Sequence, residues 1–317
     1  MLPIRSIKDS RQATRPARAK FALNVLDRLQ NAVSVDPSVR WVVWDDMHER
    51  MRQAVINDGF DGFQRHKDIA PQICGGGGET YLARMRERLG EETYKFAMST
   101  YRETLCGSPR DLTVVDGTSI TRTAMRHLYH LAYLLKFCRN YFGQPVDVVE
   151  IGAGFGNLAR LMLQYNVAWR SFIVDFPSSN AIQSFYMTEF FDTDQVEAWD
   201  NPAKSAKEGN ARINYLPPNA VEHFKDRSDK DRPVLLYSTM ALTEITEEGQ
   251  NYYLDHIKPD AVYVFGQTAT NALPGGIQLD DMGELSNHAM FHRLSEEFHP
   301  VDFVRGDYYS EFLGIRP

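Results

Sequence analysis

The chain has 317 residues, 43% hydrophobic and 24% charged, a balance typical of a globular protein with a sizeable core. Its formal net charge of -7 argues against nucleic-acid or anionic-membrane partners, because both require clustered basic residues. No apolar stretch approaches the roughly 20 residues that cross a bilayer. Three widely spaced cysteines argue against disulfides and favour a reducing cytoplasm.

Helical periodicity dominates the first part of the chain, residues 1–144. Apolar positions at helical spacing predict helices over residues 19–32, 36–57, 79–89, 91–105 and 119–141. The four glycines that follow Cys74 are more typical of a hinge than of a ligand contact. We expect this part to form a helical cap or lid over a second domain.

The second part, residues 145–317, alternates between short apolar runs and helical patterns. The runs predict seven strands, over residues 146–151, 171–176, 212–215, 233–238, 261–267, 301–304 and 310–315. Apolar strands separated by helices indicate a parallel sheet covered on both faces, and the last two strands predict an antiparallel hairpin at its edge. The fold class is therefore α/β, with a Rossmann-like seven-stranded sheet and an N-terminal helical cap.

A glycine-rich turn, Gly152-Ala153-Gly154-Phe155-Gly156, joins the first of these strands to a helix. Missing Cβ atoms let the backbone approach a ligand, and the N–H groups at the helix start are free to bind it. Dinucleotide-binding turns have a glycine where this chain has Asn157. The acid Glu150, just before the turn, suits a cation better than a pyrophosphate. S-adenosylmethionine, with its sulfonium and ammonium groups, is such a ligand.

An acid also ends the second predicted strand, at Asp175. A carboxylate in this position can accept both hydroxyls of a ribose, and Phe176 beside it is placed to flank an adenine. The alternative is that Asp175 caps the turn before Pro177. Because the acid accompanies the glycine turn, we expect it to bind a nucleoside.

The stretch from Glu150 to Gly156, together with Asp175, resembles the class I S-adenosylmethionine-dependent methyltransferases, over residues 145–317. A narrower similarity, to the sugar O-methyltransferase family, lies in residues 172–177, residues 236–239, Glu244 and residues 303–315. The resemblance implies an enzyme that uses S-adenosyl-L-methionine. It also implies that Ser238, Thr239 and Met240 line the cofactor, although Met240 is equally typical of a core residue.

Three residues are candidates for the catalytic base: Glu244, His288 and His292. The two histidines lie four residues apart on one face of a helix predicted over residues 282–298, and a near-neutral pKa suits either as a base. A zinc pair is the rival interpretation, but the glutamate of the metalloprotease motif does not follow His288. Asp280 and Asp281 more plausibly cap that helix than bind magnesium, so we expect no metal.

The predicted function is methyl transfer to a hydroxyl of a small-molecule acceptor, a sugar or a similar metabolite. N-methylation of an amine or guanidine stays open, because Glu244 would pair with a cationic acceptor. A nicotinamide-dependent oxidoreductase and a non-catalytic cofactor-binding protein are the alternatives from other classes. A homodimer also stays open.

Overall fold

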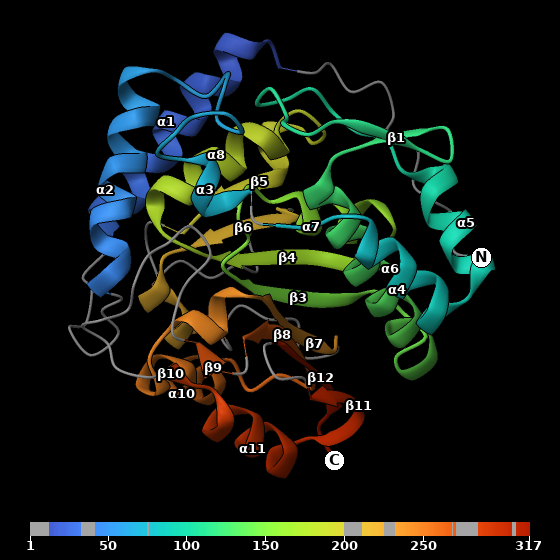
Figure 1. The fold of residues 1–317 in the computed structure, drawn as a ribbon. Coiled ribbons are helices and arrows are strands. Elements are labelled where there is room, and N and C mark those ends of the chain that lie inside the picture. The colour runs from blue at the N-terminus through green and yellow to red at the C-terminus, as the bar shows by residue number, and fades with distance from the viewer. Residues whose placement is uncertain are drawn as a thin grey trace.

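A computed structural model describes residues 13–32, 42–74, 76–199, 211–224, 232–267, 269–270, 285–305 and 309–317. Its centre is an eight-stranded sheet with the order β11-β12-β8-β7-β3-β4-β6-β5 (Figure 1). The strands are β3 (Val146–Ile151), β4 (Ala168–Val174), β5 (Val196–Ala198), β6 (Ile213–Leu216), β7 (Val234–Thr239), β8 (Ala261–Gln267), β11 (His299–Arg305) and β12 (Tyr309–Ile315).

The six strands from β3 to β8 are parallel to their neighbours in the sheet, whereas β12 pairs antiparallel with both β8 and β11. The predicted α/β class, the mostly parallel sheet and the antiparallel terminal strands are confirmed. The predicted number of strands is wrong by one. The additional strand is β5, whose three residues are too few to carry a recognisable period.

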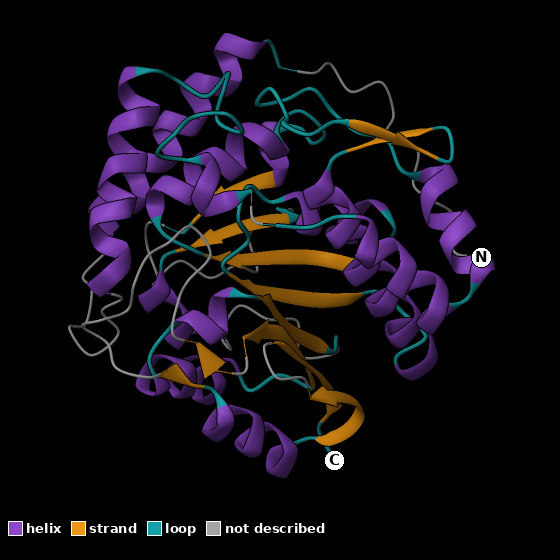
Figure 2. Ribbon diagram, in the orientation of Figure 1, coloured by secondary structure: helices purple, strands orange, loops and turns teal. Residues whose placement is uncertain are grey.

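Helices cover both faces of the sheet (Figure 2). On one face lie α7 (Asn157–Gln164) and α8 (Pro177–Met187), together with the N-terminal helices. On the other lie α10 (Glu247–Ile257) and α11 (His288–Glu297). Successive side chains of β3 point to opposite faces of the sheet: Val148 packs against the helices of the first face and Val149 against those of the second.

The first part of the chain contains α1 (Arg15–Ala32), α2 (Val42–Asn57), α3 (Ala70–Ile73), α4 (Glu79–Leu89), α5 (Glu91–Thr100), the hairpin of β1 (Thr113–Val115) and β2 (Thr118–Ile120), and α6 (Arg122–Tyr141). Helix α1 packs on α8, and α6 packs on α7. The boundary predicted near residue 145 separates two sequence patterns, but the helices before it and the sheet after it share one buried cluster.

Several predicted helices are shorter in the structure. The helix predicted over residues 91–105 ends at Thr100, and the one predicted from residue 119 begins at Arg122 because β2 precedes it. The described part of the helix predicted over residues 282–298 begins at His288, after β10 (Leu285–Ser286), which pairs with β9 (Ala269–Thr270). None of the described helices is long and apolar enough to cross a membrane.

Candidate functional site

The glycine turn has the backbone that only glycine adopts without strain. Gly152, Gly154 and Gly156 have φ angles of 71°, 58° and 88°. Space is also restricted: a Cβ on Gly154 would lie 2.8 Å from the carbonyl oxygen of Ile73, and one on Gly152 would overlap Ala241. Two of these glycines are therefore required by neighbouring parts of the chain itself, independently of any ligand.

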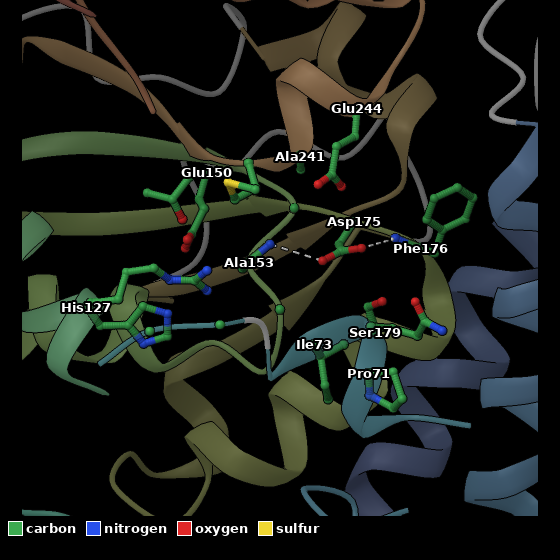
Figure 3. A pocket seen from close by; sticks show the side chains of 18 of the residues that line it. Pro71, Ile73, His127, Glu150, Ala153, Asp175, Phe176, Ser179, Ala241 and Glu244 are labelled. Carbon is green, nitrogen blue, oxygen red and sulfur yellow. Dashed lines mark hydrogen bonds between the residues drawn. The ribbon is translucent and has the colours of Figure 1, made fainter. Parts of the chain in front are cut away.

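A cavity of about 370 Å³ lies beside this turn, between the carboxyl ends of β3, β4 and β7 and the N-terminal helices (Figure 3). Its volume is within the range of small-molecule sites. The predicted site residues that line it are Glu150, Gly152, Ala153, Gly154, Asp175, Phe176, Thr239, Met240 and Glu244. Sequence segments that end three different strands thus meet at one edge of the sheet, as parallel strand order requires.

Asp175 fastens the turn to the end of β4. Its carboxylate accepts hydrogen bonds from the backbone N–H groups of Ala153, at 3.1 Å, and Phe176, at 2.8 Å, and from Nε2 of Gln183, at 2.7 Å. Burial raises the pKa of Asp175 to about 6, although these hydrogen bonds oppose the change. Asp175 therefore holds the glycine turn against the end of β4, with two of the three bonds on Oδ2 and one on Oδ1.

Glu150 and Glu244 are the other two carboxylates of the cavity. Tyr237 donates a hydrogen bond to Oε2 of Glu150 at 2.6 Å, and burial raises the pKa of Glu150 to about 8. Burial raises the pKa of Glu244 to about 7, and the charge of Arg126 opposes that rise. In Figure 3 the carboxylate of Glu244 enters the cavity from the β7 side, opposite Ile73 of α3. Near neutral pH Asp175 is mostly ionised and Glu244 about half ionised, and a bound cation would also favour ionisation of Glu150, so the cavity is suited to a cation.

Met240, directly after β7, has a strained backbone. Its φ of 96° is rare for a residue with a side chain. The strain is maintained by hydrogen bonds on both sides, from Met240 N–H to the oxygen of Phe265 at 2.7 Å and from Thr243 Oγ1 to the oxygen of Met240 at 2.6 Å. Strained backbone concentrates at functional sites, and Met240 lies in the cavity wall.

Three predicted cofactor residues support the site from outside the cavity lining. Gly156 is the N-cap of α7. The Oγ of Ser238 donates to the oxygen of Ile151 at 3.0 Å and accepts from the N–H of Leu242 at 2.9 Å, so it ties β7 to β3. Asn157 is buried and contacts His127 and Tyr186. Their predicted contact with a cofactor stays a prediction, because these three residues lie behind the cavity lining.

His288 and His292 lie on the exposed side of α11, away from the cavity. The buried side of α11 carries Met290, Phe291 and Leu294, which pack against the opposite face of the sheet. The side chain of His292 is 73% exposed. The expectation that either histidine reaches the acceptor is therefore corrected. Asp280 and Asp281 lie outside the described residues.

The N-terminal helices contribute residues that the sequence argument missed. His48 of α2 stacks on Phe176 with ring centroids 3.5 Å apart, and burial lowers the pKa of His48 to about 3, so its ring is neutral. Arg126 and His127 of α6 also line the cavity. Residues 119–141 contain many polar residues, and periodicity alone does not separate Arg126 and His127 from exposed ones such as Arg122. Among the described residues, no three His, Cys, Asp or Glu side chains are grouped to hold a metal ion.

No family model matches the chain, and the curated proteins include no match. Similar solved structures include the N-methyltransferase NodS from Bradyrhizobium japonicum WM9 with S-adenosylhomocysteine, at 12% identity over 59% of this chain and 86% of that one, with a TM-score of 0.38. The 1,6-didemethyltoxoflavin-N1-methyltransferase of Burkholderia thailandensis is 13% identical over 59% of this chain and 77% of its own, with a TM-score of 0.35. TrmK of M. capricolum is 14% identical over 59% and 67%, with a TM-score of 0.34. At such low similarity neither a reaction nor a substrate can be carried over to this chain.

Proposed function

We propose that the chain binds S-adenosylmethionine in this cavity and transfers its methyl group to a hydroxyl of a small molecule, a sugar or a similar metabolite. The observation that carries the proposal is the meeting of Glu150, Asp175 and Glu244 around a glycine turn in one cavity. At the glycine turn, Asp175, together with Glu150 once a bound cation displaces its proton, would stabilise a cationic nucleoside and disfavour the pyrophosphate of a dinucleotide. A cavity of about 370 Å³ under a layer of helices also suits a small molecule better than a polynucleotide.

The order of strands suggests how the cofactor would lie. Asp175 and Phe176 follow β4, so the ribose and adenine would lie on that side. The methionine part would pass over the glycine turn after the neighbouring β3, above Glu150. The sulfonium would then face Thr239 and Met240 after β7, with the acceptor beyond it.

Glu244 is the base that we propose for the reaction. The acceptor oxygen would attack the methyl carbon, the carbon–sulfur bond would break with its electron pair remaining on sulfur, and the hydroxyl proton would pass to Glu244. Its pKa of about 7 suits a base at neutral pH. Since no described residue forms an ion pair or hydrogen bond with Glu244, its carboxylate is available to the acceptor.

A second candidate is N-methylation, favoured by the same unpaired carboxylate, because Glu244 would pair equally well with a protonated amine. The two differ in the consequence of neutralising the side chain. Loss of a base lowers kcat, whereas loss of a charge partner chiefly raises KM for the amine.

The cofactor is tested by isothermal titration calorimetry with S-adenosylhomocysteine and with NAD. We expect the first to bind and the second not to, and binding of NAD alone would refute the proposal. Transfer is tested with labelled S-adenosylmethionine and a panel of sugars and amines. Glu244→Gln should lower kcat by about 10²–10⁴-fold with unchanged affinity for S-adenosylhomocysteine. Glu247→Gln, an exposed acid at the start of α10, is the matched control.

A further inference from the structure

Arg126 is a buried cation that forms no ion pair or hydrogen bond through its side chain with the part of the chain that the structure describes. It lies on α6, its exposed fraction is 8%, and its Nε has no hydrogen-bond partner. No described residue forms an ion pair with its guanidinium, although Arg126 lines the cavity. An arginine stays charged even when burial lowers its pKa, as it does here. An unpaired buried charge is strongly unfavourable, so this arrangement calls for an anion from outside the chain.

Arg126 lines the cavity together with Tyr81, Glu244 and Tyr309, and these neighbours place it on the proposed acceptor side. Of the groups that influence its pKa, Glu244 is the carboxylate, and the others are the ionisable side chains of Tyr81, Tyr309 and Cys74. Tyr309 begins β12 and pairs with Gln267 at the end of β8, and Glu244 follows β7. These elements lie on the side of β3 that is opposite to β4 and Asp175.

The next residue, His127, faces the glycine turn instead. Its ring centroid is 6.0 Å from that of Phe155, and its Nδ1 lies 2.9 Å from Nδ2 of Asn157. Tyr186 donates to the Oδ1 of Asn157 at 2.8 Å, which assigns Nδ2 as the donor toward His127. Nδ1 of His127 is then an acceptor, so the neutral ring carries its proton on Nε2.

Two consecutive residues of α6 thus offer donors to different parts of one cavity. Because the ring of His127 lines the cavity and lies near Phe155 of the turn, its Nε2–H is available to the amino-acid part of a cofactor bound there. The carboxylate of that part therefore has a donor of its own, besides the N–H groups at the start of α7. Arg126 is therefore not required for the cofactor's carboxylate and is available to bind a different anion.

We propose that Arg126 binds an anionic oxygen group of the acceptor, a carboxylate or a phosphate, so that the substrate is a hydroxyl compound that also carries an acid group. This inference rests on the proposed function. A guanidinium presents a planar fork of donors that matches both groups. With the acid group held by Arg126, the hydroxyl would be directed toward Glu244 on the same side of the cavity.

The first experiment tests whether Arg126 binds the carboxylate of the cofactor rather than an anion of the acceptor. Arg126→Gln, Arg126→Lys and the wild type are titrated with S-adenosylhomocysteine and with 5′-methylthioadenosine, which lacks the amino-acid part. Arg122→Gln is the matched control, because Arg122 is exposed one turn earlier on α6. We expect the Kd of S-adenosylhomocysteine to change by less than about two-fold in every variant. If Arg126→Gln weakens S-adenosylhomocysteine but not 5′-methylthioadenosine, Arg126 holds the cofactor's carboxylate and the proposal is overturned.

The second experiment measures the response to anions. Thermal unfolding of each protein, with S-adenosylhomocysteine bound, is followed with D-glucuronate, D-glucose 6-phosphate and neutral D-glucose. At least one anion should raise the Tm of the wild type and Arg122→Gln more than glucose does, and the better anion identifies the acid group. Arg126→Gln should lose that rise and Arg126→Lys should keep part of it. Equal shifts in Arg126→Gln, or no shift in the wild type, would overturn the proposal. Should the wild type fail to bind S-adenosylhomocysteine, the proposed function falls, while the anion response is still scored on the unliganded protein.

Discussion

Replacing Glu150 with glutamine is expected to flatten the dependence of stability on pH in the unliganded protein. Glu150 is 1% exposed, and the hydroxyl of Tyr237 donates to it at 2.6 Å. Burial raises the pKa of Glu150 from an ordinary value of 4.5 to about 8. Between these two pH values the folded protein keeps a proton that the unfolded chain has lost.

The sign and size of the effect follow from that difference. A raised pKa in the folded state contributes stability that is complete below pH 4.5 and is lost as the pH rises through about 8. One proton changes the free energy of unfolding by about 1.4 kcal/mol per pH unit. From about pH 5 to about pH 7.5, wild type should therefore lose about 3 kcal/mol relative to Glu150→Gln. Asp175 and Glu244 titrate in the same direction, but they are present in both proteins and cancel.

Urea unfolding at several pH values, followed by circular dichroism, measures this difference directly. The free energy of wild type minus that of Glu150→Gln is plotted against pH, and the slope is read between the two pKa values. Glu247→Gln, at an exposed position, is the control and should give a nearly flat difference. Parallel curves for wild type and Glu150→Gln would refute the claim that Glu150 is protonated in the folded protein near neutral pH.

Three further predictions concern the same cavity. Gly143→Ala, at a φ of 65° with no atom near the added Cβ, should lower the free energy of unfolding by about 1–2 kcal/mol. Gly154→Ala, whose Cβ would lie 2.8 Å from a backbone oxygen, should lower it further and also weaken the binding of S-adenosylhomocysteine. Equal losses in urea unfolding would contradict the argument from crowding. Calorimetry should show that affinity for S-adenosylmethionine rises with pH as Asp175 and Glu244 ionise through about 6 and 7, and rises less for the uncharged thioether product; identical profiles would exclude contact with the sulfonium. Tyr237→Phe removes a hydrogen bond that lowers the pKa of Glu150, so the affinity for S-adenosylmethionine should fall at neutral pH and recover in alkaline buffer. An unchanged pH profile would show that ionisation of Glu150 does not contribute to binding.

The sheet and the glycine turn could be predicted from the sequence because both follow from local patterns. Apolar runs bounded by helical periods indicate buried parallel strands, and three closely spaced glycines indicate a turn with positive φ. Asp175 could be placed beside that turn, because the ends of neighbouring parallel strands meet at one edge. Strand β5 was missed since three residues at a sheet edge carry too little pattern.

Only the tertiary structure decided what covers this edge. Periodicity indicates which side of an element is buried, but it does not identify the element that buries it. His48, Arg126 and His127 reach the cavity because α2 and α6 pack over the ends of the strands, whereas α11 turns His288 and His292 to solvent on the other face. The local sequence determined the turn and its acids, and packing between distant segments selected the charged groups that face them.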